Sequence, residues 1–424
     1  MGRDGGPNRT EEVSPGMETS NRRPPELIAP AGDMERLRTA LHFGADAVYF
    51  SGKQFSLRTF SKNFTLPELA EAVCYTHARQ KRAYLAVNGF VKNRDLALLR
   101  SYIDAVSEMG FDAVIVSDPA VFELCREKMP SVPLHLSTQA NTTNLMSARH
   151  WFSQGFRRII LARELSLEEI REIKAKTDGE IEVFIHGALC MAYSGRCLLS
   201  LYLAGRDANQ GLCTQTCRWK YALVEEKRPG QYLPIEEDRQ GTYILNSKDL
   251  CLLSLLPELI RSGIDAFKIE GRRKGIHYLA AVIKSYRWAM DRYLEDPIGY
   301  QLPAVCWEEI RKVSNRDYTS GFLNGQGESS ICLEQEQPNR PSTLAGVIRH
   351  PGEEGWACVD VRSRIVIGDT LEQLGESFPN PVFPLSAMKT AEDTECREAH
   401  EGDHVRLRLP SQARPGDLLR KMIS

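Results

Sequence analysis

The feature of this sequence that most restricts its fold is a series of eight short apolar runs between residues 24 and 300. Each run has the length and the β-branched or aromatic content of a strand, and amphipathic helical segments separate the runs. The runs are ELIAPAG (26–32), DAVYFSG (46–52), RAYLAVNG (82–89), DAVIVSD (112–118), PLHLSTQ (133–139), RIILARE (158–164), EVFIHGA (182–188) and DAFKIEGR (265–272). Strands that alternate with helices in this way predict a parallel sheet covered on both sides.

A repeated unit at the ends of the helices supports this pattern. Gly44-Ala-Asp-Ala-Val48, Gly110-Phe-Asp-Ala-Val114 and Gly263-Ile-Asp-Ala-Phe267 each join a helix stop to a strand start. Glycine is favoured there because the residue past a helix end often takes a positive φ. Capping boxes at Thr65–Glu68 and Ser166–Glu169 mark helix starts. Eight such units predict a TIM-like (β/α)8 barrel, with an open doubly wound sheet as the alternative.

The rest of the chain divides into segments of different character. Residues 1–23 are polar and without periodicity, which predicts a disordered tail. The barrel over 24–300 would be the catalytic domain, interrupted after its seventh strand by a cysteine-rich insertion at 189–245. Residues 301–342 read as a helical connector, and alternating segments over 343–424 predict a small all-β, barrel-like domain.

Composition excludes several classes of protein. No stretch approaches ~18 consecutive apolar residues, so a membrane span is excluded. The 54 Lys and Arg residues against 56 Asp and Glu leave a net charge of -2, which excludes a uniformly basic surface but allows a local basic groove. The first 25 residues lack the apolar core of a secretory signal, so we expect a cytoplasmic protein with reduced thiols.

Four of the 11 cysteines lie within the insertion. Six residues separate Cys190 from Cys197, three separate Cys213 from Cys217, and fifteen separate the two pairs. Four thiolates from one loop suit an iron–sulfur cluster or a structural zinc, and the wide spacing leans away from zinc. We therefore predict that these four bind metal, with Cys251 on the next helix (247–262) as an alternate ligand. Buried structural cysteines are the other interpretation.

Polar residues at the carboxyl ends of the strands would face the mouth of such a barrel. These positions are Pro30, Ser51, Asn88, Asp118, Ser137, Gln139, Arg163, His186, Glu270 and Arg272. Roughly half of them would be turn-forming residues without a functional role. Glu270 is expected to point into the mouth, and Arg272, Arg273 and Lys274 to face an anion at the next helix N-terminus. A solvated basic turn is the alternative for these three.

Two further motifs have competing interpretations. The insertion also carries Tyr193, Arg196, Arg206, Arg218, Trp219, Lys220 and Tyr221. Arginine beside aromatics is typical of a surface that stacks bases and grips phosphates, or else of a loop that packs its own aromatics. His400-Glu-Gly-Asp-His404 fits the H-E-x-x-H pattern of zinc proteases. Because Gly402 and Asp403 suit a helix poorly, we interpret it as a β-turn.

Seven motifs resemble a known family. They are ELIAPAGD (26–33), GADAVYFSG (44–52), HLSTQANTTN (135–144), HGALCMAYSGRCLLS (186–200), GRDANQGLCTQTCRWKY (205–221), NSKDL (246–250) and KIEGR (268–272). The sequence is similar to the collagenase-like peptidase family U-32, and within it to the branch of prephenate-dependent tRNA uridine hydroxylation proteins. The similarity covers about residues 25 to 325, with a weaker match to the β domain of that branch. KGIHYL after KIEGRR departs from the KS and two tyrosines usual in relatives.

The resemblance implies a TIM-barrel-like core, a [4Fe-4S] cluster, and a tRNA partner recognised at its anticodon region. It implies hydroxylation of the wobble uridine to 5-hydroxyuridine, dependent on prephenate rather than on molecular oxygen. The cluster ligands would be Cys190, Cys197, Cys213 and Cys217. The candidate acid–base or orienting residues are His186 and Glu270, and the candidate prephenate-binding residues are Arg163, Arg272 and Arg273. The alternatives are a peptidase and a non-catalytic RNA-binding scaffold that holds a cluster.

Overall fold

The computed structural model describes residues 23–57, 62–190, 192–218, 236–238, 241–243, 248–314, 317–324, 342–410 and 412–423. Residues 1–22 of the predicted tail (1–23) lie outside these residues, as do Trp219, Lys220 and Tyr221. Within them, no helix combines the length and the apolar character that crossing a lipid bilayer requires.

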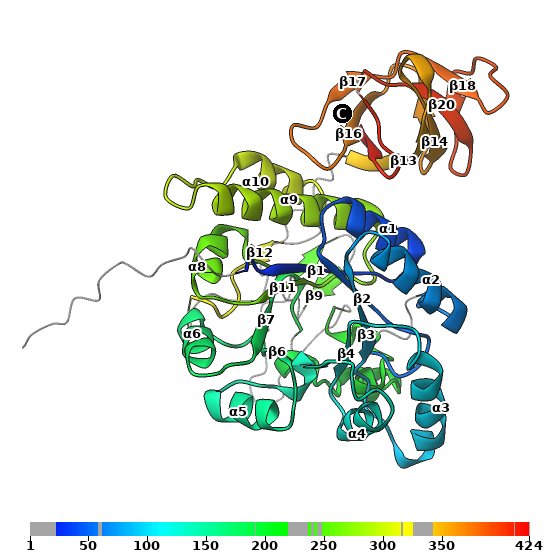
Figure 1. Ribbon diagram of the computed structural model, residues 1–424. Coiled ribbons are helices and arrows are strands. Elements are labelled where there is room, and N and C mark those ends of the chain that lie inside the picture. The colour runs from blue at the N-terminus through cyan, green and yellow to red at the C-terminus, as the bar shows by residue number, and fades with distance from the viewer. Residues whose placement is uncertain are drawn as a thin grey trace, which may run out of the picture.

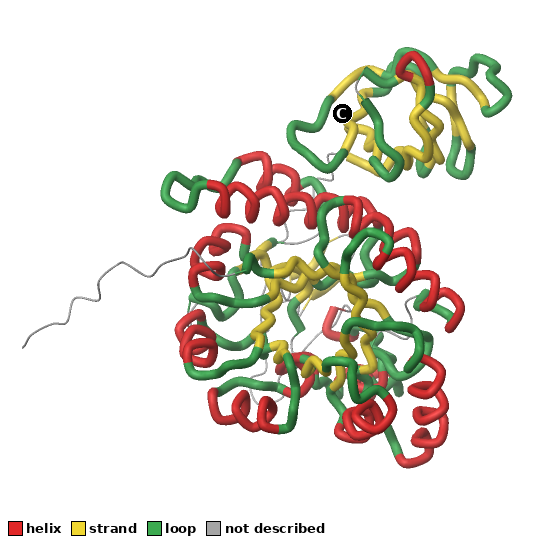
Figure 2. The backbone as a smooth tube through the Cα atoms, in the orientation of Figure 1, coloured by secondary structure: helices red, strands yellow, loops and turns green. Residues whose placement is uncertain are grey.

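Eight parallel strands form a closed barrel with helices around its outside (Figures 1 and 2). The strands are β1 (Glu26–Pro30), β2 (Ala47–Phe50), β3 (Arg82–Val87), β4 (Ala113–Val116), β5 (Leu134–Leu136), β6 (Arg158–Ile160), β7 (Glu180–Ala188) and β11 (Ala266–Ile269). The last strand, β11, pairs with both β1 and β7, which closes the ring. The predicted TIM-like barrel is therefore confirmed, and an open sheet is wrong.

Helices surround the barrel, and two of them begin at the capping boxes that the sequence predicts. The principal helices around the barrel are α1 (Met34–His42), α2 (Leu66–His77), α3 (Leu96–Val106), α4 (Pro119–Lys128), α5 (Leu145–Ser153), α6 (Leu167–Ala175), α8 (Leu256–Arg261) and α9 (Ile276–Glu295). At the start of α2, Thr65 N donates to Glu68 Oε2 at 2.7 Å, and Glu68 N donates to Thr65 Oγ1 at 3.4 Å. Ser166 and Glu169 repeat this box at α6. Local hydrogen bonds thus fix the helix starts.

Charged side chains fill part of the barrel interior, which the sequence pattern did not predict. Arg158 Nη1 lies 2.8 Å from Glu26 Oε2 and 3.3 Å from Glu182 Oε2. Lys268 Nζ lies 2.7 Å from the other oxygen of Glu182. All four side chains are buried. Buried charges are tolerated only when they are paired, so these residues form one mutually dependent network.

The insertion after β7 folds over the end of the barrel. Its described elements are η3 (Tyr193–Gly195), α7 (Leu199–Ala204), η4 (Ala208–Gln210), η5 (Thr216–Arg218), β8 (Glu236–Asp238) and β9 (Gly241–Tyr243). The helix predicted over 247–262 is partly wrong, because its first turn is strand β10 (Asp249–Cys251). This strand pairs antiparallel with the end of β7 and parallel with β12 (Tyr318–Thr319). Pairing with the backbone at the end of β7 therefore outweighs the helical pattern of apolar residues in this segment.

The C-terminal part is an antiparallel sheet that curves into a half-barrel, as predicted for an all-β, barrel-like domain. Its strands, in sheet order, are β17 (Val382–Pro384), β16 (Thr370–Leu374), β21 (Leu418–Met422), β13 (Ser342–Pro351), β14 (Trp356–Val361), β20 (His404–Arg408) and β18 (Met388–Thr390). The short strands β15 (Ile365–Val366) and β19 (Glu398–Ala399) pair separately. Figure 1 shows the domain beside α9 and α10 (Ala304–Arg311), and buried ion pairs join it to α10. The segment predicted as a helical connector (301–342) contains helix α10, and it also contains strand β12.

Candidate active site

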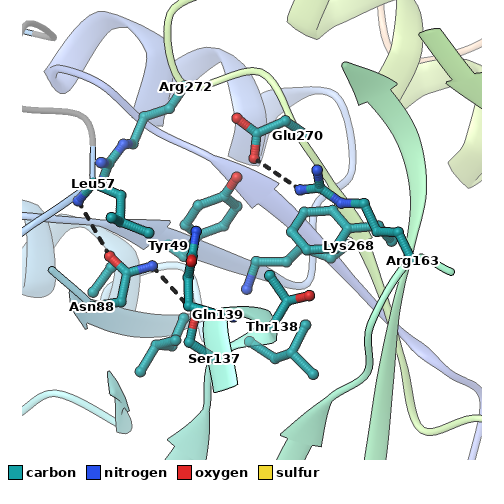
Figure 3. A pocket seen from close by; sticks show the side chains of 14 residues that line it. Tyr49, Leu57, Asn88, Ser137, Thr138, Gln139, Arg163, Lys268, Glu270 and Arg272 are labelled. Carbon is teal, nitrogen blue, oxygen red and sulfur yellow. Dashed lines mark hydrogen bonds and ion pairs between the residues drawn. The ribbon is translucent and has the colours of Figure 1, made fainter. Parts of the chain in front are cut away.

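Two adjacent cavities open at the carboxyl ends of the barrel strands. The outer cavity measures ≈ 330 Å³ and is lined by residues of the insertion and of the turn after β11. The inner cavity measures ≈ 60 Å³ and lies inside the barrel (Figure 3). Both are lined by Leu57, Thr138, Gln139, Arg163 and Glu270. The two cavities therefore form one site, with a wide entrance and a narrow floor.

Each of the four cysteines predicted as ligands lines the outer cavity. These residues are Cys190, Cys197, Cys213 and Cys217. They are exposed or partly exposed to solvent. Within the described ranges, no three His, Cys, Asp or Glu side chains are gathered closely enough to hold a metal ion. The structure thus brings the thiols to one cavity without converging them, and their role as ligands stays a prediction.

Polar contacts fix the loop that carries these cysteines to the rim of the barrel. The carboxylate of Glu164, which follows β6, accepts hydrogen bonds from Ser194 N at 2.6 Å and from Ser194 Oγ at 2.5 Å. The side-chain amide of Asn209 pairs with the backbone of Cys197, accepting at 3.2 Å and donating at 3.1 Å. Phe90 N donates to the carbonyl of Asn209 at 3.0 Å. The backbone around Cys197 is therefore anchored to two barrel loops.

Arg163 and Glu270 point toward each other across the opening of the inner cavity (Figure 3). Arg163 Nη2 lies 3.9 Å from Glu270 Oε2, and its Nη1 donates to the carbonyl of Ala188 at 3.3 Å. The guanidinium also lies over the ring of Phe184, 4.0 Å from its centroid. These contacts hold a cation and a carboxylate at the junction of the two cavities, where both can contact a bound molecule.

The predicted basic turn divides between the two cavities. Arg272 is buried and lines the inner cavity, where it donates to Ser51 Oγ at 2.6 Å and to Ser56 Oγ at 3.1 Å. Arg273 is exposed and lines the outer cavity together with Lys274. Arg163, Arg272 and Arg273 therefore all line the two connected cavities, and their role in binding an anion stays a prediction.

Lys268 also lines the inner cavity, and sequence reasoning missed it. Its Nζ lies 4.3 Å from the centroid of the Tyr49 ring and bonds to Glu182. Burial lowers the pKa of Lys268, although the charge of Glu182 opposes this effect. Strand periodicity could have identified it, since Lys268 lies two residues before Glu270 and side chains two apart share a face.

The predicted position of His186 at the barrel mouth is wrong. A β-bulge shifts the register of β7 against β11, so that Lys268 faces Phe184 but Ile269 faces His186. The extra residue turns the His186 side chain away from the barrel interior. On the outer side of the strand, the side chain is fully buried against Tyr286 and Tyr318. Burial lowers the pKa of His186 to about 3, which keeps the imidazole neutral.

Cys251, the predicted alternate ligand, lies in the same buried layer and lines neither cavity. Its Sγ is 3.6 Å from Tyr286 Oη, and burial raises the pKa of the thiol to about 11. A buried thiol with a raised pKa is a poor metal ligand, because ligation requires the thiolate. The structure therefore separates Cys251 from the four cavity cysteines.

Gly187 allows the turn after β11 to approach β7, and its replacement gives a test of this geometry. Its φ is +110°, and a Cβ there would collide with the Glu270 carbonyl oxygen and lie 2.9 Å from Glu270 Cβ. Gly110 also has a positive φ, +78°, but faces open space. We expect Gly187→Ala to lower the free energy of unfolding by about 1–3 kcal/mol more than Gly110→Ala, measured by denaturant titration. Equal losses would contradict the close approach.

The H-E-x-x-H motif lies in a turn of the C-terminal domain, as predicted. Gly402 takes a φ of +95°, and Asp403 N donates to the His400 carbonyl at 3.0 Å. His400 Nε2 lies 3.2 Å from Glu398, whereas His404 Nδ1 lies 2.7 Å from Asp360. The two histidines therefore do not share a helix face, which the zinc-protease arrangement requires.

Comparison with known proteins gives matches along most of the chain. Residues 32–331 match the model of peptidase family U32, and residues 340–420 match its C-terminal domain. The chain is 36% identical over 400 residues to tRNA hydroxylation protein P1 of Bacillus subtilis, covering 94% of each. It is 36% identical over 428 residues to tRNA hydroxylation protein P of Escherichia coli, covering 91% of this chain and 93% of the relative. A protein of Porphyromonas gingivalis named Collagenase is 31% identical over 409 residues, covering 93% and 97%.

Proposed function

This chain belongs to peptidase family U32, and from that premise we propose that it hydroxylates the wobble uridine of tRNA to 5-hydroxyuridine. The observation that carries the proposal is the similarity to two proteins named for tRNA hydroxylation, which spans more than nine tenths of this chain in each case. The similarity includes the insertion and the C-terminal domain, so the comparison is not limited to a common barrel. An RNA-modifying enzyme also suits a chain whose mouth combines polar, basic and thiol side chains.

We assign a [4Fe-4S] cluster to Cys190, Cys197, Cys213 and Cys217. The donor set fits in number and type, since four thiols line one cavity and soft thiolates select iron–sulfur clusters. When bound, such a cluster supplies electron transfer or a Lewis-acidic iron. The protein would position the ligands through Glu164, which bonds to Ser194, and through Asn209, which bonds to the backbone of Cys197.

We assign prephenate, a molecule with two carboxylates, to the same site as co-substrate, in place of molecular oxygen. The outer cavity of ≈ 330 Å³ lies within the range of about 300–1,000 Å³ typical of small-molecule sites. Arg163 and Arg273 on its wall can each bind a carboxylate through charge-assisted hydrogen bonds. Glu270 at 3.9 Å from Arg163 would orient that guanidinium or accept a proton from the substrate.

Nucleoside mass spectrometry of tRNA tests the proposal directly. A strain that lacks this chain and its paralogues should lose 5-hydroxyuridine and its derivatives, and the wild-type gene should restore them. We expect Arg163→Met to restore less than about a tenth of the wild-type level, because a lost hydrogen bond to a charged group costs about 1.5–3 kcal/mol. Arg292→Met, which alters an exposed arginine on α9, serves as the control. Unchanged 5-hydroxyuridine in the deletion strain would overturn the hydroxylase assignment.

The relative named Collagenase raises a peptidase as the second candidate. The H-E-x-x-H turn gives this candidate no support, because its histidines bond to separate carboxylates. If proteolysis is detected, Glu401→Ala should leave it unchanged. A non-catalytic scaffold is the third candidate, and it would bind tRNA without any effect on the nucleoside profile.

A further inference from the structure

We propose that an exposed apolar surface on the insertion stacks against unpaired bases of the RNA substrate and leads the target base to the outer cavity. This surface, called here the α7 platform, consists of Tyr193, Leu198, Leu201, Tyr202 and Leu203. The inference rests on the proposed function, since it names the recognition surface for that RNA.

The platform concentrates apolar side chains that proteins usually bury. Among the described residues, 14 large hydrophobic side chains are exposed, and five of these lie within residues 193–203. Tyr202 is 86% exposed, Leu198 67% and Tyr193 54%. Single exposed apolar residues need no explanation, but a contiguous group marks an interaction site. The platform is therefore a candidate surface for a ligand that brings its own apolar faces.

The platform residues are neighbours in the sequence of residues that line the outer cavity. Ser194, Cys197 and Ser200 alternate with platform residues along the chain, and these three side chains line the cavity. A molecule bound to the platform would therefore lie next to the segment that carries the predicted ligand Cys197. Two hydrogen bonds hold the start of the platform to the barrel. Asn141 Nδ2 donates to the Tyr193 carbonyl at 3.1 Å, and the Glu164 carboxylate accepts from Ser194 N.

Exposed cations lie close to the platform in the sequence and on a loop bonded to the insertion, and they indicate the chemistry of its occupant. Arg196 and Arg206 flank α7 in the insertion, and both are exposed. The loop after β3 carries exposed Lys92 and Arg94, and this loop joins the insertion through the Phe90–Asn209 hydrogen bond. An apolar surface edged by cations fits a ligand with aromatic faces and a negative backbone. A single-stranded RNA loop has this chemistry, because its bases are free to stack on aromatic side chains.

Binding of fluorescent tRNA, and of its isolated anticodon stem-loop, to the full-length protein tests the platform. We expect Tyr202→Leu to raise the Kd for both RNAs about 10-fold, because loss of one base–aromatic stacking contact weakens binding by about that factor or more. Tyr202→Phe, which keeps the ring, should stay within about two-fold of wild type. Ile298→Ala, which alters a fully exposed residue beyond the end of α9, is the control and should leave binding unchanged. Thermal melts check that the variants are folded.

Three outcomes would overturn the platform. Wild-type binding by Tyr202→Leu would remove Tyr202 from recognition and point to a protein partner for the surface. A loss in Tyr202→Phe equal to that in Tyr202→Leu would assign the effect to the hydroxyl group. An equal loss with a fully paired RNA duplex would exclude unpaired bases as the ligand. Each leaves the hydroxylase proposal intact, because that proposal fails only on the nucleoside profile of the deletion strain.

Discussion

Replacing Arg420 with methionine is expected to lower the free energy of unfolding by about 3–5 kcal/mol, one of the largest stability losses available in this chain. Arg420 is fully buried between the C-terminal sheet and α10. Its Nη1 donates to Glu309 at 2.6 Å, and its Nη2 and Nε donate to Glu372 at 2.7 and 2.9 Å. Without the guanidinium, two buried carboxylates would face each other with Lys312 and Lys284 as the nearby cations. The loss comes mainly from those uncompensated charges.

Denaturant unfolding measures this loss, and two further variants show its origin. Arg292→Met removes an exposed pair with Glu295 on α9 and should cost about 0–1 kcal/mol. Adding Glu309→Leu to Arg420→Met should recover part of the stability, because it removes one of the two buried charges. A loss in Arg420→Met no larger than in Arg292→Met would contradict the role of this cluster in joining the domains.

The pH dependence of stability gives a second readout of the same cluster. Burial would raise the pKa of Glu372, but hydrogen bonds and charge from Arg420 and Lys312 outweigh it and lower the pKa to about 2. Because the folded pKa lies below the ordinary value of 4.5, this carboxylate stabilises the fold above pH 4.5. The contribution is lost as the pH falls from 4.5 toward 2. The unfolding free energy of Arg420→Met should therefore fall less steeply over that range than that of wild type.

The barrel could be predicted from the sequence because each of its strands and helices depends on residues that are close together in the chain. The eight apolar runs, the capping box at Thr65 and the positive-φ glycine at Gly44 each depend on a few neighbouring residues. Six strand-end residues likewise line the inner cavity, since position at the end of a strand determines position in a barrel. These residues are Asn88, Ser137, Gln139, Arg163, Glu270 and Arg272.

The errors arose where distant partners decide the structure. The helical pattern at residues 249–251 yields to a strand because the edge of β7 offers hydrogen bonds there. His186 leaves the mouth because of one extra residue in β7, which no local pattern reveals. Lys268 and Glu182 were not identified as a buried pair, since burial of a charge depends on a partner elsewhere in the chain. The sequence pattern thus located the site at the strand ends, but it did not predict which side chains face the barrel interior.

Replacing Cys213 with serine is expected to remove nearly all iron and sulfide from the anaerobically purified protein, together with its visible absorption. Among the cysteines that the structure describes, none besides these four lines the outer cavity, and Cys251 is buried away from them beside Tyr286. Gln215 N also donates to Cys213 Sγ at 3.4 Å, a contact that helps to position the sulfur on the cavity wall.

Two matched variants and one metal analysis decide how the cysteines are used. Cys74→Ser, at an exposed thiol on α2, and Cys251→Ser should both keep the iron content of wild type. In the complementation assay, Cys213→Ser should fail to restore 5-hydroxyuridine while Cys74→Ser restores it. If zinc is found in place of iron, the four thiols would form a structural zinc site, which is the alternative that their sequence spacing left open. A colourless wild-type protein without iron or sulfide would overturn the cluster, and retained iron in Cys213→Ser would exclude Cys213 as a required ligand.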